Sequence, residues 1–430
     1  MSDELKAYRG RLLHCPGAVS SADDCEYLDD GILLVRGGHI EAVLGADQRS
    51  ELSADIEFLD YQRNWIVPGF IDCHVHYPQL DMIGAYGEQL LDWLETYTYP
   101  AEMRFADPDF AANAAEFFLD QLLRHGTTTA LVFATVHAHS ADALFNAAAR
   151  RQMRLITGKT LMNRNCPPQL CDTADTGVAE SRELIRRWHG RDRLLYAITP
   201  RFAPTSTAGQ LEMAGELAAE FPDVYIHTHL AETRRECAWV AELFPDRRSY
   251  LDVYDHFRLV RDRAVFAHAL YVDDRDRDRL AAARAAVAFC PSSNLFLGSG
   301  LFDLAATSAA GVRTGLGTDV GGGTSLGLMQ TVDDAYKVSQ LRGHGMTPWE
   351  AFYLATLGGA RALHLDDRIG NFATGKEADF IVLDTAATPL AARRSAAAAD
   401  HWEELFAAMI LADDRMVRQT FVNGRPMSGQ

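Results

Sequence analysis

Short apolar segments recur through the middle of the chain, and each is followed by a stretch with the period of an amphipathic helix. The segments end in polar or small residues, and the stretches between them are rich in Ala, Arg and Glu. Eight such segments can be identified: 66–76, 127–134, 154–162, 194–202, 224–230, 264–270, 286–290 and 312–319. Helices are expected after them, for example at 208–221 and 348–363. Eight strand-helix units predict an α/β fold, a (β/α)8 TIM-type barrel rather than an open sheet.

The two ends of the chain have a different pattern, in which short apolar runs are separated by turn residues. Residues 31–44 contain two short strands around Gly37-Gly38, and residues 379–384 and 416–425 contain strands with a turn dipeptide. We expect both ends to pair beside the barrel. The predicted organisation is a small β-sandwich domain formed by residues 1–66 and 375–430, with the barrel formed by residues 67–374.

Composition narrows the classes of protein to be considered. With 48% hydrophobic and 23% charged residues, the chain is typical of a globular protein with a large core. The 41 Lys and Arg residues and 59 Asp and Glu residues give a net charge of −18 at pH 7, which argues against a nucleic-acid partner. We find no signal peptide and no membrane span, so we expect a cytoplasmic protein with no membrane partner. Seven scattered cysteines fit a reducing compartment, and we expect no disulfides.

The strongest chemical motif is His74-Val-His76, at the end of the first barrel segment. Side chains alternate between the two faces of a strand, so His74 and His76 point the same way and could share one ion. The motif lies at the C-terminal end of the strand, where barrel enzymes have their active sites. On its own a His-x-His pair is weak support for a metal site. We interpret Cys73, which lies off the shared face, as a packing residue.

Other barrel segments bring similar side chains to the same rim. The fifth segment supplies His227 and His229, with Glu232 just beyond it; the sixth carries His268 and the eighth ends at Asp319. Buried imidazoles and carboxylates are costly without partners, so their convergence from four strands is difficult to explain by packing alone. The pattern therefore predicts a metal site at this rim.

The predicted ligands are three imidazoles and one carboxylate, with room for a water: His74, His76, His229 and Asp319. This donor set suits Zn²⁺, our first choice, or Fe²⁺. Bound zinc can lower the pKa of its water from 15.7 to about 7. Glu232 is placed to carry the proton, although a carboxylate there could instead favour a helix N-terminus. We expect one ion rather than two, because two-metal barrel hydrolases usually use a bridging lysine; Lys159 stays open as an exception.

Seven stretches resemble the amidohydrolase superfamily and, within it, the purine deaminases that use a single metal ion. They include PGFIDCHVHYPQ at 68–79, TPRFA at 199–203, THLAE at 228–232 and TDVGGGTS at 318–325, and the others are 91–102, 158–165 and 289–300. Their order and spacing fit the family from about residue 67 to residue 325. One departure is Asn163, where the family pattern has Asp. It weakens inferences about that loop but not about the metal site.

The resemblance implies hydrolytic deamination of guanine to xanthine and ammonia by a homodimeric enzyme. It implies the metal ligands predicted above, catalytic roles for Glu232, Asp319 and His268, and substrate contacts from a further set that includes Glu232: Gln79, Arg201, Phe202 and Glu232. In the implied mechanism, a metal-activated water oriented by Asp319 and His268 attacks C2 of guanine. Glu232 then passes the proton to N3 and helps protonate the departing amine, with no covalent enzyme intermediate.

The implied role of Arg201 is consistent with its chemistry. A guanidinium is a permanent cation with a planar set of donors, which suits the C6 carbonyl of guanine, whereas adenine has an amino group there. A site built on such donors rejects the wrong edge because a mismatch leaves buried groups unpaired. The alternative for Arg201 is an ion pair on the surface.

Two other functions stay open at this point. One is a single-metal deaminase that acts on another purine, a triazine or a nucleoside, which Gln79 together with Arg201 and Phe202 disfavours. The other is a noncatalytic scaffold, because some barrels of this lineage lose their metal and serve in assembly; the complete ligand set argues against it. The sequence does not assign a role to His137, His139 or His227.

Overall fold

The computed structural model describes residues 4–53, 55–87 and 89–427. Eight parallel strands form the barrel: β5 (Phe70–His76), β6 (Thr127–Phe133), β7 (Arg154–Gly158), β9 (Leu194–Pro200), β10 (Tyr225–Leu230), β11 (Ala264–His268), β12 (Ala286–Phe289) and β13 (Arg313–Leu316). The short β8 (Thr160–Leu161) pairs with β9. Backbone hydrogen bonds from Asp319 N to His74 O and from His76 N to Val320 O, each 2.9 Å, join the last strand to the first. The predicted (β/α)8 fold is confirmed.

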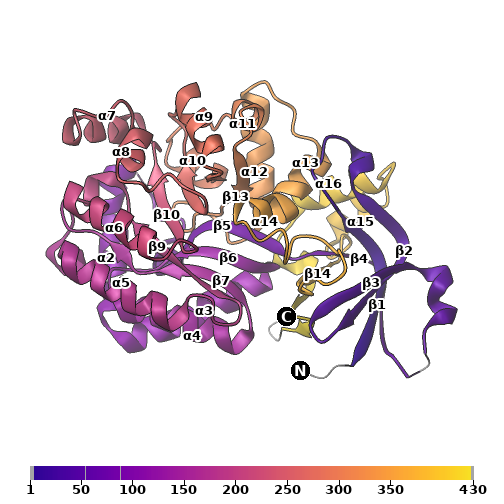
Figure 1. Cartoon of the computed structure of the whole chain (residues 1–430). Coiled ribbons are helices and arrows are strands. Elements are labelled where there is room, and N and C mark those ends of the chain that lie inside the picture. The colour runs from indigo at the N-terminus through magenta and orange to yellow at the C-terminus, as the bar shows by residue number, and fades with distance from the viewer. Residues whose placement is uncertain (1–3, 54, 88, 428–430) are drawn as a thin grey trace.

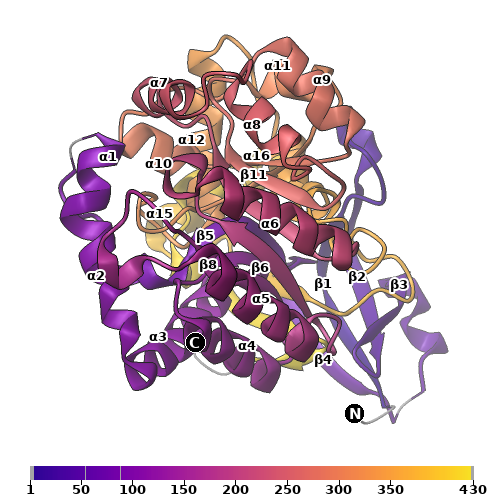
Figure 2. The same cartoon turned by 60° about the vertical axis from the view of Figure 1, so that its left-hand side comes forward.

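Helices cover the outside of the barrel (Figures 1 and 2). After β5 come α1 (Leu90–Trp93), α2 (Tyr99–Met103) and α3 (Pro108–Arg124), and a π-helical turn over Leu94–Thr98 joins the first two. The later helices are α4 (Ala138–Arg151), α5 (Ala174–Trp188), α6 (Ala208–Glu220), α7 (Arg234–Leu243), α8 (Tyr250–His256), α9 (Asp274–Ala282), α10 (Pro291–Phe296), α11 (Leu304–Ala309), α12 (Leu328–Leu341), α13 (Pro348–Tyr353) and α14 (Gly359–Ala362). Helix α6 begins where the Thr207 hydroxyl accepts a hydrogen bond from Gln210 N, a typical N-cap.

The interior of the barrel is apolar below the rim that carries the histidines. Its buried side chains include Ile71, Leu131, Ile156, Tyr225 and Val265. Helix α14 packs against these residues, and the Tyr225 hydroxyl donates a hydrogen bond of 2.6 Å to Leu363 O just after that helix. The barrel is therefore a packed core with polar chemistry confined to its C-terminal end.

Strands from both ends of the chain form one seven-stranded sheet beside the barrel (Figure 1). In spatial order these are β16 (Arg425–Pro426), β15 (Val417–Val422), β14 (Phe380–Leu383), β4 (Glu57–Pro68), β1 (Leu5–His14), β2 (Glu26–Arg36) and β3 (His39–Gly45). Helices α15 (Pro389–Ser395) and α16 (His401–Leu411) lie between β14 and β15 in the chain. The predicted β domain built from both termini is confirmed. The domain boundaries after residues 66 and 374 stay a prediction.

The chain passes from this sheet directly into the barrel. The predicted segment 66–76 is two strands, because β4 ends at Pro68 and β5 begins at Phe70. Between them, a side chain at Gly69 would collide with Thr128 at the start of β6. Only glycine allows the two sheets to approach this closely.

The expectation that the chain has no disulfides is wrong at one pair. Strands β1 and β2 pair antiparallel with His14 opposite Glu26, so the next residues, Cys15 and Cys25, face each other and form a disulfide. The pairing depends on strand register, which the spacing of the cysteines does not reveal. The other five cysteines are free. Among the described residues, no helix has the length and apolar character needed to cross a membrane.

Candidate active site

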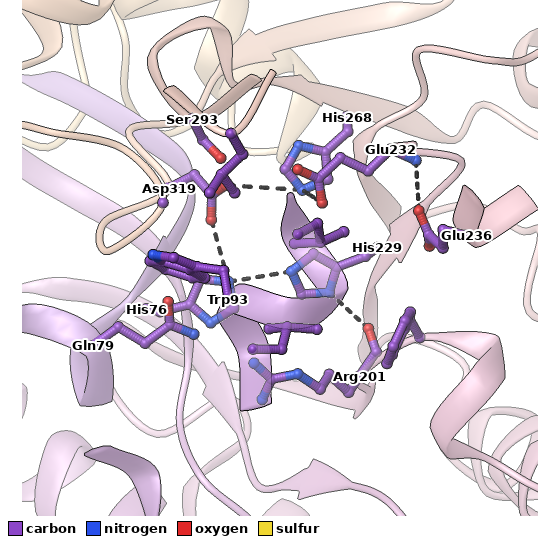
Figure 3. Close-up of a pocket in the computed structure, with 15 residues that line it drawn as sticks. His76, Gln79, Trp93, Arg201, His229, Glu232, Glu236, His268, Ser293 and Asp319 are labelled. Atoms are coloured by element: carbon purple, nitrogen blue, oxygen red, sulfur yellow. Dashed lines mark hydrogen bonds and ion pairs between the residues drawn. The ribbon is translucent and has the colours of Figure 1, made fainter. Parts of the chain in front are cut away.

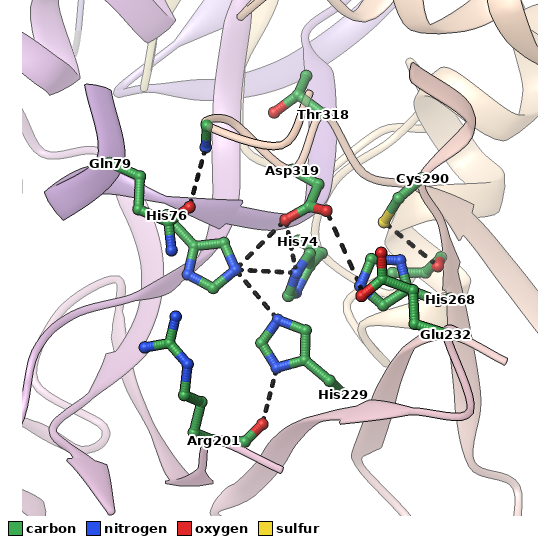
Figure 4. A network of polar contacts seen from close by, with 12 residues as sticks. His74, His76, Gln79, Arg201, His229, Glu232, His268, Cys290, Thr318 and Asp319 are labelled. Carbon is green, nitrogen blue, oxygen red and sulfur yellow. Dashed lines mark hydrogen bonds and ion pairs between the residues drawn. The ribbon is translucent and has the colours of Figure 1, made fainter. Parts of the chain in front are cut away.

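Polar side chains gather at the C-terminal ends of four barrel strands. β5 carries His74 and His76, β10 carries His229, β11 ends at His268, and Asp319 follows β13. These side chains point toward one another at the centre of the rim (Figure 4). The structure thus brings together the residues that the sequence pattern predicts for a metal site.

Three imidazole nitrogens and one carboxylate oxygen form a compact group, which we call the donor group: His74 Nε2, His76 Nε2, His229 Nε2 and Asp319 Oδ1. His76 Nε2 lies 3.2 Å from the Nε2 atoms of both His74 and His229. Asp319 Oδ1 lies 3.1 Å from His74 Nε2 and 3.3 Å from His76 Nε2. A tetrahedral ion with ligands at about 2.0–2.1 Å separates its ligands by about 3.3–3.4 Å. The donor group therefore fits a single divalent cation.

The outer nitrogens of two of these rings have partners that orient them. His229 Nδ1 donates a hydrogen bond of 2.7 Å to Arg201 O, so in the neutral ring Nε2 is unprotonated and faces the donor group. His74 Nδ1 lies 2.7 Å from His227 Nε2. His227, whose role the sequence leaves open, therefore contacts the outer nitrogen of His74 and helps to orient that ring.

His268 has a different hydrogen-bond environment. The side-chain amide of Asn294 donates a hydrogen bond of 3.0 Å to His268 Nδ1, so the neutral ring carries its proton on Nε2. That nitrogen lies 3.4 Å from Glu232 Oε2 and 3.8 Å from Asp319 Oδ2, and it has no hydrogen-bond partner among the described residues. By distance alone His268 could be a ligand, since donor atoms of His74, His229, His268 and Asp319 lie within 4.8 Å of one another. Its protonated Nε2 instead suits a hydrogen bond to a water or a substrate atom.

Burial and neighbouring side chains together determine the charges of His76, His268 and Asp319. Removal from water lowers the pKa of His76 to about 4 and that of His268 to about 3, so both rings are neutral at pH 7. Burial alone would raise the pKa of Asp319, but the neighbouring His74 and His76 hold it well below its ordinary value. Neutral imidazoles beside an ionised carboxylate are the protonation states that bind a divalent cation.

Glu232 faces the donor group from the loop after β10. Its Oε1 atom accepts a hydrogen bond of 2.9 Å from the Ser299 hydroxyl. Burial raises the pKa of Glu232 well above its ordinary value, and the negative charge of Asp319 adds to the rise. Such a carboxyl group is suited to exchange a proton near neutral pH. The helix-capping role considered for Glu232 belongs to Glu236 instead. Its Oε2 accepts hydrogen bonds from the backbone N–H groups of Glu232 and Thr233.

A cavity opens beside the donor group (Figure 3). Its combination of apolar walls with a few polar groups is typical of a small-molecule site. The apolar walls are formed by Leu90, Trp93, Leu94, Phe202 and Leu297. The predicted substrate contacts Gln79, Arg201 and Phe202 all line this cavity.

Arg201 is buried rather than exposed, so the alternative of a surface ion pair is wrong. Its Nη1 donates to both carboxylate oxygens of Glu102, each at 2.8 Å. Burial alone would lower the pKa of Arg201, but the Glu102 carboxylate raises it above its ordinary value. Sequence reasoning missed Glu102; its only signal was its place in the 91–102 stretch.

Other residues considered from the sequence lie outside the cavity. His139 Nε2 contacts Phe105 O at 2.7 Å, and His137 stacks on His139 with ring centroids 5.4 Å apart. Lys159 Nζ lies 2.6 Å from Asp172 Oδ2 and forms a second ion pair with Glu180 at 2.5 Å. The Lys159 ammonium is therefore engaged by two carboxylates away from the donor group.

A barrel with a group of possible metal ligands and a buried carboxyl group at the C-terminal ends of its strands has the arrangement of a barrel hydrolase. Residues 65–427 match the amidohydrolase family, and the chain belongs to this family. The resemblance to its guanine deaminases is confirmed. Guanine deaminase from Escherichia coli is 48% identical over 98% of this chain and 97% of its own length.

Solved structures give the same result. The structure of the E. coli guanine deaminase covers 98% of this chain and 99% of its own, with a TM-score of 0.96. A guanine deaminase from C. acetobutylicum, solved with guanine bound in its active site, is 26% identical, with a TM-score of 0.90 over 99% of this chain and 100% of its own. The similarity therefore extends over the whole barrel and the terminal sheet.

Proposed function

We propose that this chain hydrolyses guanine to xanthine and ammonia. The observation that carries the proposal is the donor group with Glu232 on one wall of a cavity and N–H donors on another. The relatives described above support the same substrate. Water supplies the oxygen that replaces the 2-amino group: a C2–O bond forms, the C2–N bond breaks, and the amine leaves as ammonia.

The ligands we propose for one divalent cation are the donor group residues: His74, His76, His229 and Asp319. Zinc is the first choice, and Fe²⁺ is the alternative. When bound, such an ion lowers the pKa of a coordinated water toward 7, so that hydroxide is available at neutral pH. The neutral state of His76 and the ionised state of Asp319 are compatible with this role.

Glu232 and His268 have complementary roles in the proposed reaction. The Glu232 carboxylate accepts the proton of the attacking water, delivers it to N3 of guanine and then helps protonate the leaving amine. The Nε2 proton of His268 hydrogen-bonds the attacking oxygen, and the ionised Asp319 orients it. Support comes from His268 Nε2, which has no hydrogen-bond partner among the described residues and lies 3.4 Å from Glu232 Oε2.

Arg201, Gln79 and Phe202 hold the purine in this proposal. The Arg201 and Gln79 side chains offer N–H donors, which match the O6 and N7 acceptors of guanine. Phe202 and the neighbouring apolar walls cover the faces of the ring. Adenine places an amino group where guanine has O6, so its binding would oppose donor to donor.

An ultraviolet assay across related substrates tests this proposal. Purified, metal-loaded protein should convert guanine to xanthine with release of one ammonia, and should leave adenine, guanosine and an aminotriazine largely unchanged. Faster turnover of any of these three than of guanine would favour the competing deaminase. No turnover by fully metal-loaded protein would favour the noncatalytic scaffold.

We also propose that the enzyme is a cytoplasmic homodimer. The homodimer rests on the resemblance alone. Light scattering of the purified protein should give twice the chain mass of 47.5 kDa, and a single-chain mass at micromolar concentration would contradict it.

A further inference from the structure

Glu102 of helix α2 lies between the two polar side chains that we assign to substrate binding. Its carboxylate accepts two contacts of 2.8 Å from Arg201 Nη1 and one of 3.2 Å from Gln79 Nε2. All three side chains are almost completely buried, with 0% of Glu102, 2% of Arg201 and 3% of Gln79 exposed. We propose that Glu102 is a positioning residue that makes this wall of the cavity a pure hydrogen-bond donor surface. The inference rests on the proposed deamination of guanine. It identifies the residue through which the site selects the O6 and N7 edge of the purine.

Glu102 determines the orientation of the Gln79 amide. A carboxylate only accepts hydrogen bonds, so the Gln79 atom facing it must be the amide nitrogen. The amide oxygen then lies on the other side, where it accepts a hydrogen bond of 3.2 Å from Gly321 N. Two separate partners therefore favour the same rotamer, which leaves the second Nε2 hydrogen of Gln79 for a ligand. Figure 4 shows this nitrogen on the side of Arg201.

Glu102 also compensates the positive charge of Arg201 and determines the direction of its guanidinium. Both of its oxygens are occupied by Nη1, and the Nε and Nη2 groups of Arg201 have no hydrogen-bond partner among the described residues. Without Glu102, the guanidinium would be a buried and uncompensated cation. With it, the wall offers N–H donors but carries no net charge from this pair. Such a wall fits a neutral purine that presents two adjacent acceptors.

Replacing Glu102 by glutamine would remove both effects with little change of shape. The new amide carries hydrogens of its own, so Gln79 could turn its oxygen toward the cavity. The charge of Arg201 would then be uncompensated. The variant should therefore lose its preference for the O6 and N7 edge of a 6-oxopurine over the amino edge of adenine.

The test compares Glu102→Gln and Glu102→Asp with the wild-type holoenzyme. Glu95→Gln is the matched control, because it makes the same change at an exposed site on the same segment. We expect Glu102→Gln to raise KM for guanine at least tenfold while kcat changes less than threefold. Glu102→Asp, which keeps the charge, should recover part of the loss. A fall in kcat as large as the rise in KM, or an unchanged KM, would overturn the proposal.

A binding measurement separates this proposal from the proposed reaction. Hypoxanthine keeps the O6 and N7 edge but lacks the 2-amino group, and adenine presents the opposite edge at C6. By equilibrium binding, the wild type should favour hypoxanthine over adenine, and Glu102→Gln should reduce that ratio at least tenfold without changing metal content. An unchanged ratio overturns the role of Glu102. If the wild type bound hypoxanthine but did not hydrolyse guanine, only the proposed reaction would fail.

The proposal can still be tested if Glu102→Gln does not fold. Thermal unfolding of both variants is recorded first. If Glu102→Gln is unfolded, Glu102→Asp alone decides, because moving the carboxylate back by one methylene should raise KM severalfold with kcat near the wild-type value. A KM for Glu102→Asp equal to that of the wild type would contradict a positioning role.

Discussion

At the scale of single residues, the partners of each imidazole distinguish the histidines that can hold a cation. His229 donates from Nδ1 to a backbone carbonyl and so presents a lone pair on Nε2, whereas His268 accepts on Nδ1 and presents a proton. The sequence pattern predicts that these side chains share one rim, because parallel strands end on the same face. It cannot predict which residues contact the outer nitrogens of the rings. His227 contacts His74 and Asn294 contacts His268.

The first prediction separates His76 from His268. His76→Ala removes a member of the donor group and should weaken zinc affinity roughly 100-fold or more. His268→Ala should keep its zinc and lose most of its turnover. Metal analysis of both proteins after dialysis checks this, and loss of zinc from His268→Ala with retention in His76→Ala would reverse the assignment.

A second prediction concerns the proton carrier. Glu232→Gln should keep zinc and lower kcat by roughly 10² to 10⁴, the usual contribution of a positioned acid or base. Because burial raises the pKa of Glu232, wild-type activity should fall on the acid side at a pH above the ordinary glutamate value. Glu216→Gln, exposed on α6, is the control. Normal turnover by Glu232→Gln would remove the assignment.

At the scale of elements, a cluster of ion pairs links the terminal sheet to the barrel. Glu377, just before β14, accepts hydrogen bonds of 2.9 Å from Arg154 Nε of β7 and 3.0 Å from Arg193 Nε. Arg193 also pairs with Asp379. Burial alone would raise the pKa of Glu377, but the two guanidinium groups lower it below its ordinary value of 4.5.

Glu377→Gln should therefore lower the free energy of unfolding by about 3 kcal/mol at pH 7, because two buried cations lose their partner. A carboxylate with a lowered folded-state pKa contributes stability above its unfolded-state pKa and loses it as the pH falls. The difference between variant and wild type should thus shrink below about pH 4.5. Urea unfolding between pH 3.5 and 7 measures it, with Glu183→Gln on α5 as control; a difference independent of pH would contradict the ion-pair explanation.

The elements show what sequence periodicity can predict. Segments buried on both faces, such as β6 and β9, contain no charged residue, and their predicted bounds lie close to the observed ones. Strand β1 was not predicted, because Lys6, Arg9 and Arg11 interrupt its apolar positions. These side chains are accommodated by ion pairs with Glu57, Asp30 and Glu404, which lie far away in the chain. The Cys15–Cys25 disulfide was missed because it depends on the register of β1 and β2, which the spacing of the cysteines does not reveal.

At the scale of the whole molecule, the proposed cation joins β5, β10 and the segment after β13, which lie far apart in the chain. An ion that binds only the folded state adds stability, about 2.7 kcal/mol at a free concentration 100 times its Kd. Adding zinc to metal-free protein should therefore raise Tm by a few degrees. Differential scanning fluorimetry checks this, and His76→Ala should show a much smaller rise. An equal rise in both proteins would indicate that zinc binds elsewhere.

The most direct test of the proposed chemistry is a titration of metal-free protein with zinc while xanthine and ammonia are measured from added guanine. We predict that xanthine formation rises in proportion to zinc up to about one equivalent per chain, then stays constant, with one ammonia for each xanthine. Full activity in the presence of a chelator that has removed all metal, or a rise that continues to two equivalents, would contradict a single activating ion held by these four residues.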